Sequence, residues 1–175
     1  EHGKQSNAFV QLLGKAKSPY YRVAAVPISG NENEVTYFWG FDSYATLEKY
    51  SQDLEMWANG PFKAEFEKLD RQGADLHAAQ RDVIANYRED LSYRAKFNVG
   101  EAHYMIIVTI RARPGHQMDF NEARKIVLAA HEKAKLEEHY YVYEASSGTP
   151  GPTYFVFVPL KSLKELDADI HGKAY

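Results

Sequence analysis

The chain has 175 residues and a net charge of −3, and 45% of its residues are hydrophobic. It has no cysteine, which excludes disulfides, thiolate catalysis and cysteine-ligated metals. Its intermixed charges argue against a nucleic-acid partner, which needs a clustered basic face, and no apolar run approaches the roughly 20 residues that span a bilayer. The chain begins at Glu1, so a removed export signal is compatible with the sequence and the compartment is not predicted.

The first part of the chain predicts two helices around a pair of strands. In chain order, we expect helix, strand, strand and helix over residues 1–17, Tyr20–Ile28, Val35–Phe41 and Tyr44–Ala58. Ser18-Pro19 ends the first helix, because proline disfavours helical geometry in the preceding residue. Asp42 or Ser43 caps the second helix, and Asn59-Gly60-Pro61 breaks it.

A helical insert follows over about residues 60–90. Its first helix is indicated by Phe62, Phe66 and Leu69, and a second by apolar residues from Leu76 to Tyr87. The alternation of apolar and polar residues over Leu91–Phe97 then predicts a half-buried strand.

The second part predicts a strand, a helix, two strands and a last helix. These run over His103–Arg113, Gln117–Lys135, His139–Ser146, Thr153–Val158 and from Leu160 to the C-terminus. The apolar face of the first strand should meet the helix through its inward stripe. That contact is expected between Phe120, Ile126, Val127 and Ala130 on the helix and Ile106, Val108 and Ile110 on the strand. The loop Gly148–Pro152 is predicted to be a hairpin turn.

The two parts are similar in sequence after a shift of about 118 positions. Lys15-Ala16-Lys17 falls on Lys133-Ala134-Lys135, and Ser29-Gly30 falls on Ser147-Gly148. With one residue of slip, Thr36-Tyr37-Phe38 falls on Thr153-Tyr154-Phe155, which makes Phe38 and Phe155 equivalent. Because helix phase, turn and strand match in the same order, we interpret the similarity as an internal duplication.

The repeated order resembles half of a ferredoxin-like βαββαβ unit. Two such units resemble the dimeric α/β-barrel superfamily, which includes antibiotic-biosynthesis-monooxygenase-like and NIPSNAP-like domains. The resemblance is carried by Arg113-Pro114-Gly115, by Met118 and Phe120, by the strand Thr153–Val158 and by their counterparts in the first part. It covers nearly the whole chain outside residues 60–90, and its motifs specify a fold and no catalytic signature.

The resemblance implies an α+β protein in which two ferredoxin-like repeats with antiparallel sheets form a pseudo-dimeric α/β barrel. The first repeat would occupy residues 1–100, with the insert, and the second residues 101–175. Each would lack one strand, and we expect the natural chain to extend beyond both ends or a partner molecule to supply the strands. A homo-oligomer is expected.

Candidate site residues lie on, or next to, the strand faces that carry both apolar and polar side chains. They are Tyr37, Trp39, Trp57, His103, Arg111, His131, Tyr141 and Tyr143. If these faces of the two sheets oppose each other, the aromatic and polar groups would line a pocket for a small apolar or aromatic ligand. The alternative is that the same faces interdigitate as a core with tyrosine hydroxyls at its rim, and we favour this alternative.

His131 replaces Leu13 of the first repeat at the margin of the inward helix stripe. A titratable group at a leucine position suggests an asymmetric cavity. A slightly rotated helix that leaves His131 in solvent is the simpler interpretation, and we favour it. No metal site is predicted, because His131-Glu132-Lys133-Ala134-Lys135 has a lysine where the second histidine of HExxH belongs.

Three functions are compatible with these residues. The first is a non-catalytic small-molecule-binding or assembly domain that needs no cofactor. The second is a cofactor-free monooxygenase- or isomerase-like enzyme acting on aromatic substrates, as in the superfamily that the chain resembles. The third is a haem-binding or haem-degrading protein with His131 or His103 as axial ligand. We place them in this order, because the sequence contains no catalytic constellation and the second and third rest on fold analogy.

Overall fold

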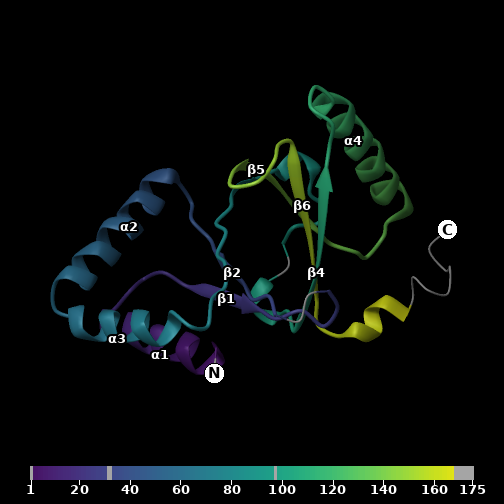
Figure 1. Ribbon diagram of the computed structural model, residues 1–175. Helices are drawn as coiled ribbons and strands as arrows, with labels where there is room; N and C mark the ends of the chain where they lie inside the picture. Colours follow the sequence, from purple (N-terminus) through teal and green to yellow (C-terminus); the bar gives the residue numbers. More distant parts are fainter. Residues whose placement is uncertain (1, 31–32, 97, 168–175) are drawn as a thin grey trace. The chain divides into compact units, whose positions relative to one another are not determined.

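The computed structural model describes residues 2–30, 33–96 and 98–167 (Figure 1). In this part of the chain there are four α-helices and two antiparallel sheets, so the protein belongs to the α+β class. Both sheets are open rather than closed into barrels. The chain divides into two compact units, Glu1–Gln80 and Arg81–Tyr175, called the N-terminal and C-terminal units below. None of the described helices has the length and apolar content needed to cross a membrane.

The N-terminal unit contains three helices and a two-stranded sheet. Its elements are α1 (His2–Lys15), β1 (Arg22–Ala25), β2 (Thr36–Trp39), α2 (Tyr44–Asn59) and α3 (Lys63–Gly73). The predicted cap of α2 is confirmed, since the Ser43 hydroxyl accepts a hydrogen bond from the Thr46 amide. The predicted break is also confirmed, because α2 ends at Asn59.

Helices α1 and α3 pack closely at one point. The rings of Phe9 and Phe66 meet edge to face with centroids 6.1 Å apart, and the Gln5 amide donates to the Leu69 carbonyl over 3.2 Å. A side chain at Gly73 would place its Cβ only 1.9 Å from the Gln5 nitrogen. The glycine therefore makes room for the hydrogen bond that joins the two helices.

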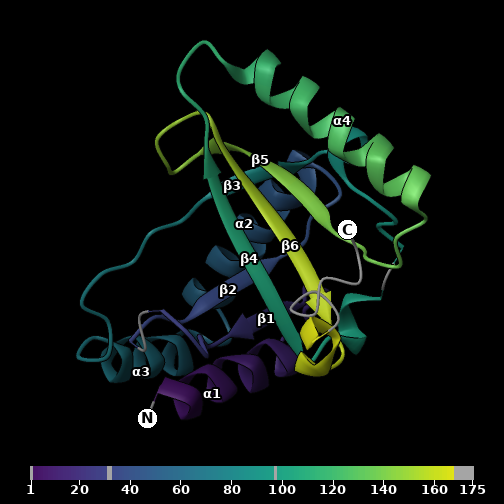
Figure 2. The same ribbon diagram turned by 90° about the vertical axis from the view of Figure 1, so that its right-hand side faces the viewer.

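The C-terminal unit is built on a four-stranded antiparallel sheet, of which one face carries a helix (Figure 2). Its elements are β3 (Ile84–Tyr87), β4 (Tyr104–Arg111), α4 (Gln117–Ala134), β5 (Tyr141–Ser147) and β6 (Thr153–Leu160). The strand order is β3-β5-β6-β4. Strands β4 and β5 both pair with β6, and α4 connects them.

The β5–β6 hairpin confirms the turn predicted at Gly148. Gly148 has φ 83°, and a Cβ there would lie 1.9 Å from the Asp82 carbonyl oxygen. Only glycine combines this backbone conformation with such a close approach. The glycine thus lets the chain leading into β3 run directly beside the end of β5.

The core of the C-terminal unit lies between α4 and the sheet. Its buried residues are Leu91, Tyr93, Tyr140, Val142, Tyr154 and Val156. Phe120 of α4 stacks on Tyr154 with ring centroids 4.1 Å apart, and Leu128 also packs against this cluster. Ile110 of β4 contacts the same cluster as predicted, but Val108 of the same predicted face is 44% exposed.

The predicted inward stripe of α4 is wrong beyond Phe120. Ile126 is 71% exposed and Val127 is 37% exposed. The helix instead turns Leu128 and Arg124 toward the sheet. An arginine can occupy such a face because its aliphatic stem covers apolar surface while its charged group lies over an aromatic ring.

Two other predicted elements differ from the structure. The strand expected over Leu91–Phe97 is absent from its described part, where Glu89–Leu91 forms a 3₁₀ turn and Tyr93 makes an isolated bridge to Tyr140. Arg94, with φ 44°, turns the chain out of extended geometry. The second insert helix is also wrong, because residues 76–83 contain no helix and Ile84–Tyr87 pairs with β5 as strand β3.

Near its end the described chain forms a 3₁₀ turn, Leu163–Leu166. Ser162 and Glu165 close a capping box at its start. The predicted last helix is wrong at its start, because Leu160 ends β6, and beyond Asp167 it lies outside the described residues.

Candidate functional site

The side chain of Arg22 lies in the N-terminal unit between α1 and the β1–β2 sheet. Its Nη2 donates to the carbonyl oxygen and the hydroxyl oxygen of Ser6, over 3.0 and 3.1 Å. Its Cζ lies 4.4 Å from the centre of the Phe9 ring and 4.6 Å from the centre of the Tyr37 ring. Trp39, paired with Arg22 across the sheet, lies at 6.0 Å. A helix residue and two strand residues thus enclose one guanidinium with aromatic rings.

The charge of Arg22 has no counter-ion in the described part of the chain. None of its nitrogens lies within 4.0 Å of a described carboxylate, and its Nε is shielded from solvent without a hydrogen-bond partner. Burial lowers the pKa of Arg22, while Tyr37 and Tyr50 act in the opposite direction. Since a shielded, uncompensated cation is unfavourable, this position favours an anion.

A groove of about 260 Å³ lies beside this cluster. It is lined by Gly3, Ser6, Asn7, Ala24, Val26, Val35 and Tyr37. Ser6 and Tyr37 also contact Arg22, so the guanidinium stands next to the groove. Small-molecule sites combine mostly apolar walls with a few polar groups, and this groove has that composition, although its volume is below their usual range of about 300–1,000 Å³.

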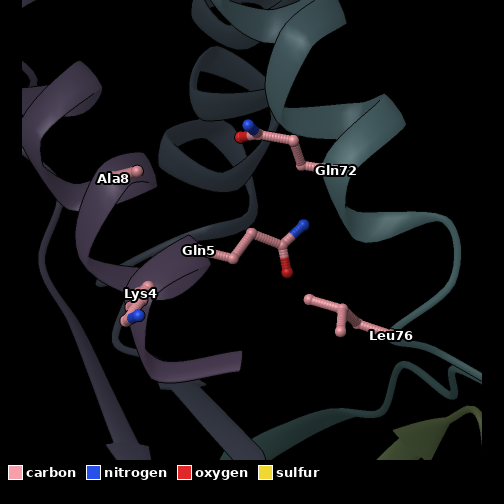
Figure 3. Close-up of a pocket in the computed structure, with 5 residues that line it drawn as sticks. All are labelled: Lys4, Gln5, Ala8, Gln72 and Leu76. Atoms are coloured by element: carbon pink, nitrogen blue, oxygen red, sulfur yellow. The ribbon is translucent and has the colours of Figure 1, made fainter. Parts of the chain in front are cut away.

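A second and larger groove, of about 510 Å³, lies between α1 and α3. Figure 3 shows its lining residues, Lys4, Gln5, Ala8, Gln72 and Leu76. Gln5 is already held by the Leu69 carbonyl. The lining includes no aromatic ring and no shielded charge, so this groove offers less to a ligand than the one beside Arg22.

Two of the predicted site residues of the N-terminal unit, Tyr37 and Trp39, lie on the side of the sheet that faces α1. Tyr37 and Trp39 are in contact, with ring centroids 5.9 Å apart. Both turn toward Arg22 and α1, so the expectation that these two rings line a sheet face opposed to another sheet is not met within the unit. Trp57 lies on α2 and is 7% exposed.

The predicted site residues of the C-terminal unit lie on two sides of its sheet. Tyr141 and Tyr143 lie on the face away from α4, where both rings contact Tyr87 at 6.3 and 5.4 Å. His131 lies on the α4 side, between Tyr93 and Tyr140. The sheet therefore separates His131 from the tyrosine pair.

His103 and Arg111 stand at opposite ends of β4, and both are exposed. The His103 amide donates to the Leu160 carbonyl at the start of the β4–β6 ladder. Neither residue joins His131 or the tyrosine pair. Among the described residues, no three histidine or carboxylate side chains gather into a metal-binding group.

The surroundings of His131 correct the solvent-exposed position favoured from the sequence. Its ring meets those of Tyr93 and Tyr140 edge to face, at 5.7 and 5.8 Å, and its Nδ1 is shielded from solvent. The helix rotates so that Phe120, Arg124, Leu128 and His131, which follow helical spacing, form the inward face.

Arg22 and Phe9 were missed by the sequence analysis. A signal was available, because Arg22 alternates with Tyr20 and Ala24 along one face of its predicted strand, as Tyr37 alternates with Trp39. An arginine on an aromatic face is a recognisable pattern, but strand pairing decides whether its neighbours surround it.

No known protein family, no curated protein and no solved structure matches this chain.

Proposed function

We propose that the chain is a non-catalytic domain that binds a small aromatic or apolar molecule carrying an anionic group. The site is the groove between α1 and the β1–β2 sheet. One observation carries this proposal: the Arg22 guanidinium is held among three aromatic rings, has no counter-ion in the described residues and borders a groove. The ring and aliphatic walls would take the apolar body, and Arg22 would take a carboxylate or phosphate group.

Tryptophan fluorescence can test this site directly. The chain has two tryptophans, Trp39 and Trp57, so Trp57→Phe leaves Trp39 as the only reporter. Titrating this variant with benzoate should give a saturable change in Trp39 emission. The neutral isostere benzamide should bind at least about tenfold more weakly, because it lacks the charge that pairs with Arg22.

Two further variants in the Trp57→Phe background complete the test. Arg22→Met should abolish the benzoate response, whereas Arg81→Met, which removes an exposed arginine outside this unit, should leave it unchanged. Val35→Phe should weaken benzoate binding by filling the groove. A response that survives Arg22→Met, or no saturable response in the parent, would contradict the proposal.

Assembly is a second candidate function, and the strand order of the C-terminal unit favours it. Strands β4 and β5 are joined by α4 and flank β6, to which both are antiparallel, the arrangement of half of a ferredoxin-like unit. We propose that two such repeats make up the chain and that it forms homo-oligomers of the barrel type.

Local geometry supports the duplication. Lys17 and Lys135 lie 118 positions apart and both end a helix in left-handed geometry, with φ of 54° and 52°. The residues after them, Ser18 and Leu136, each donate to the carbonyl five positions earlier. Gly30 and Gly148, at the same offset, both have positive φ in the hairpin turn.

The strand registers also support the duplication, but they align Phe38 with a different residue from the one that the sequence match gives. Val23 pairs with Phe38, and Tyr141, which lies 118 positions after Val23, pairs with Phe157. This register makes Phe157, rather than Phe155, the counterpart of Phe38. Sedimentation analysis tests the oligomer: a monomer at every protein concentration would contradict the assembly proposal and leave the binding proposal untouched.

The enzymatic and haem alternatives receive no comparable support from the described residues. His131 is enclosed between tyrosine rings, and His103 is exposed and stands apart from the other candidates.

A further inference from the structure

A group of polar side chains lies between α4 and the sheet of the C-terminal unit. Arg124 and His131 extend into this group from α4, and Tyr140 is the residue immediately before β5. The Arg124 Cζ lies 4.9 Å from the centre of the Tyr140 ring, and the His131 ring lies 5.8 Å from the same ring. Asn121, one turn before Arg124, adds a side-chain amide on the same helix face.

Several polar atoms of this group are shielded from solvent and have no hydrogen-bond partner among the described residues. They are Oδ1 of Asn121, Nε and Nη2 of Arg124, Nδ1 of His131 and the hydroxyl of Tyr140. Tyr140 is only 5% exposed. Arg124 does approach the Tyr140 hydroxyl and opposes the rise in the tyrosine's pKa that burial causes, but the two groups do not form a well-aligned hydrogen bond.

The neighbouring Tyr93 has hydrogen-bond partners, so these unsatisfied atoms are confined to the group around Arg124. Its hydroxyl contacts the carbonyl oxygens of Leu136 and His131, at 3.1 and 3.3 Å. Buried polar groups in folded proteins are nearly always hydrogen-bonded in this way. Several unsatisfied atoms in one place therefore favour the binding of a polar ligand there.

The chemistry of the unsatisfied atoms limits the class of ligand that could bind. Arg124 supplies two donor nitrogens and a permanent charge, Tyr140 supplies an O–H donor, and the imidazole of His131 can present Nδ1 as a donor. Water can satisfy donors but cannot neutralise a shielded guanidinium. No described carboxylate lies within 4.0 Å of Arg124. Glu138 acts on Tyr140 only through its charge, and its side chain is exposed.

We infer that Arg124, His131 and Tyr140 form a binding site for a small oxyanion, a carboxylate or phosphate group. The site is separate from the groove of the N-terminal unit and does not depend on the function proposed for that groove. The two places are related in sequence, since Ser6 and Arg22 lie 118 positions before Arg124 and Tyr140. The arginine comes from the strand in one case and from the helix in the other.

The first test measures thermal unfolding of the full chain in inorganic phosphate or acetate, with ionic strength held constant by chloride. Ligands that bind the folded state raise the melting temperature once their concentration exceeds the dissociation constant, and the rise then grows with the logarithm of the concentration. We expect this for at least one of the two anions. Phosphate alone would identify a phosphate-type ligand, whereas acetate alone would identify a carboxylate. If neither anion has an effect, the inference is wrong.

Three substitutions assign the effect to the site. In the Arg22→Met background, which removes the anion site proposed for the N-terminal unit, Arg124→Gln should abolish the anion response. In the same background, Tyr140→Phe should reduce the affinity about tenfold through loss of one hydrogen bond to the anion. Arg113→Gln removes an exposed charge and should leave the response intact. An equal response in Arg124→Gln and in the parent would overturn the inference.

Two more measurements cover misfolding and an internal counter-ion. The His131 ring resonances should shift with anion concentration in the parent protein and in Tyr140→Phe, which keeps the packing even if Arg124→Gln does not fold. Glu138→Gln tests whether that carboxylate neutralises Arg124 in solution. An anion response that appears only after Glu138→Gln would contradict the proposed site.

Discussion

The two units place a helix on a hairpin in similar ways but stabilise the contact differently. In the N-terminal unit, α1 lies on a two-stranded sheet, and the buried residues of its described part are Leu12, Leu13, Trp57 and Gly73, all in helices. In the C-terminal unit, α4 lies on a four-stranded sheet whose strands and flanking residues supply the buried cluster. The helix ends share the same left-handed lysine cap.

This difference shows which part of the arrangement depends on strand number. With two strands, the buried residues of the described part come from helices, and the arginine on the strand is surrounded by rings. With four strands, the sheet supplies a core of its own, and the helix can present Arg124 and His131 toward it. Both units thus keep a cationic side chain at the junction of helix and hairpin, while their apolar cores come from different elements.

The largest effect should follow from breaking the sheet-based core. Val142 is fully buried in β5, so Val142→Asp should destabilise the C-terminal unit by about 4–5 kcal/mol through an unpaired buried charge. Denaturant unfolding followed by far-UV circular dichroism measures the loss. The matched change Val127→Asp should cost less than about 1 kcal/mol, because this side of α4 is exposed. Equal losses of stability would indicate that Val127 faces the sheet, as the sequence predicted.

A helix-based core in the N-terminal unit predicts the next largest effect. Leu12 is 3% exposed, and Val10 on the same helix is 50% exposed. Leu12→Ala should therefore cost about 2–4 kcal/mol and Val10→Ala less than about 1 kcal/mol. Both tryptophans belong to this unit, so tryptophan fluorescence during denaturation reports its unfolding. A small loss for Leu12→Ala would mean that the unit has no core of its own.

Charged groups tie the sheet of the C-terminal unit to the turn after β3. Arg88 bonds both oxygens of Asp90, over 2.8 and 2.9 Å, and also Glu144, which accepts from the Tyr154 hydroxyl. Arg88→Met should cost about 1–2 kcal/mol, because these groups are partly exposed. In the N-terminal unit, Asp53 of α2 pairs with Lys49 of the same helix over 3.0 Å and accepts from the Tyr20 hydroxyl over 2.9 Å.

The same substitution predicts a pH dependence with a definite sign. The hydrogen bond from Arg88 lowers the pKa of Asp90 in the folded state. A lowered carboxyl pKa contributes stability above the unfolded-state pKa, near about 4, and this contribution disappears as the pH falls through the folded value. The difference between the parent and Arg88→Met should therefore shrink below about pH 4. A difference that grows on acidification would contradict this assignment.

The smallest effects concern the shared helix ends. Lys17→Gly and Lys135→Gly should each stabilise their unit by about 0.5–1 kcal/mol, since glycine adopts the left-handed conformation without steric cost. The control substitutions Lys15→Gly and Lys133→Gly lie within the helices and should destabilise by about 1 kcal/mol. Opposite signs at Lys17 and Lys135 would show that the two ends are not alike.

Much of the fold could be predicted where a local signal decided the structure. Ser43 capped α2, Asn59-Gly60-Pro61 ended it, and Gly148 formed the hairpin turn, because each depends on nearby backbone geometry. The similarity around Lys17 and Lys135 also reflects local sequence. Alternation along the strand put Ile106, Val108 and Ile110 on one face, and Ile110 of this set packs in the core as predicted.

The rest depended on long-range pairing. Ile84 looked helical next to Val83, but its pairing with β5 made it a strand. The inward face of α4 was misassigned because the choice between Val127 and Arg124 depends on Tyr140, which reaches the helix only after the sheet forms. The candidate site residues were chosen by strand parity, which does not reveal that α1 encloses Arg22 with Tyr37 and Trp39.

The edge strand β4 has a practical consequence for handling the protein. Of its eight residues, only the last, Arg111, is charged, and in the described part of the chain β4 pairs with β6 alone. Seven uncharged residues of high β-propensity on an open edge match the composition of segments that form amyloid-like fibrils. Concentrated stocks will therefore be prone to aggregate along this strand. Thr109 is exposed on the face away from α4, and a lysine there would interrupt the run without entering the core.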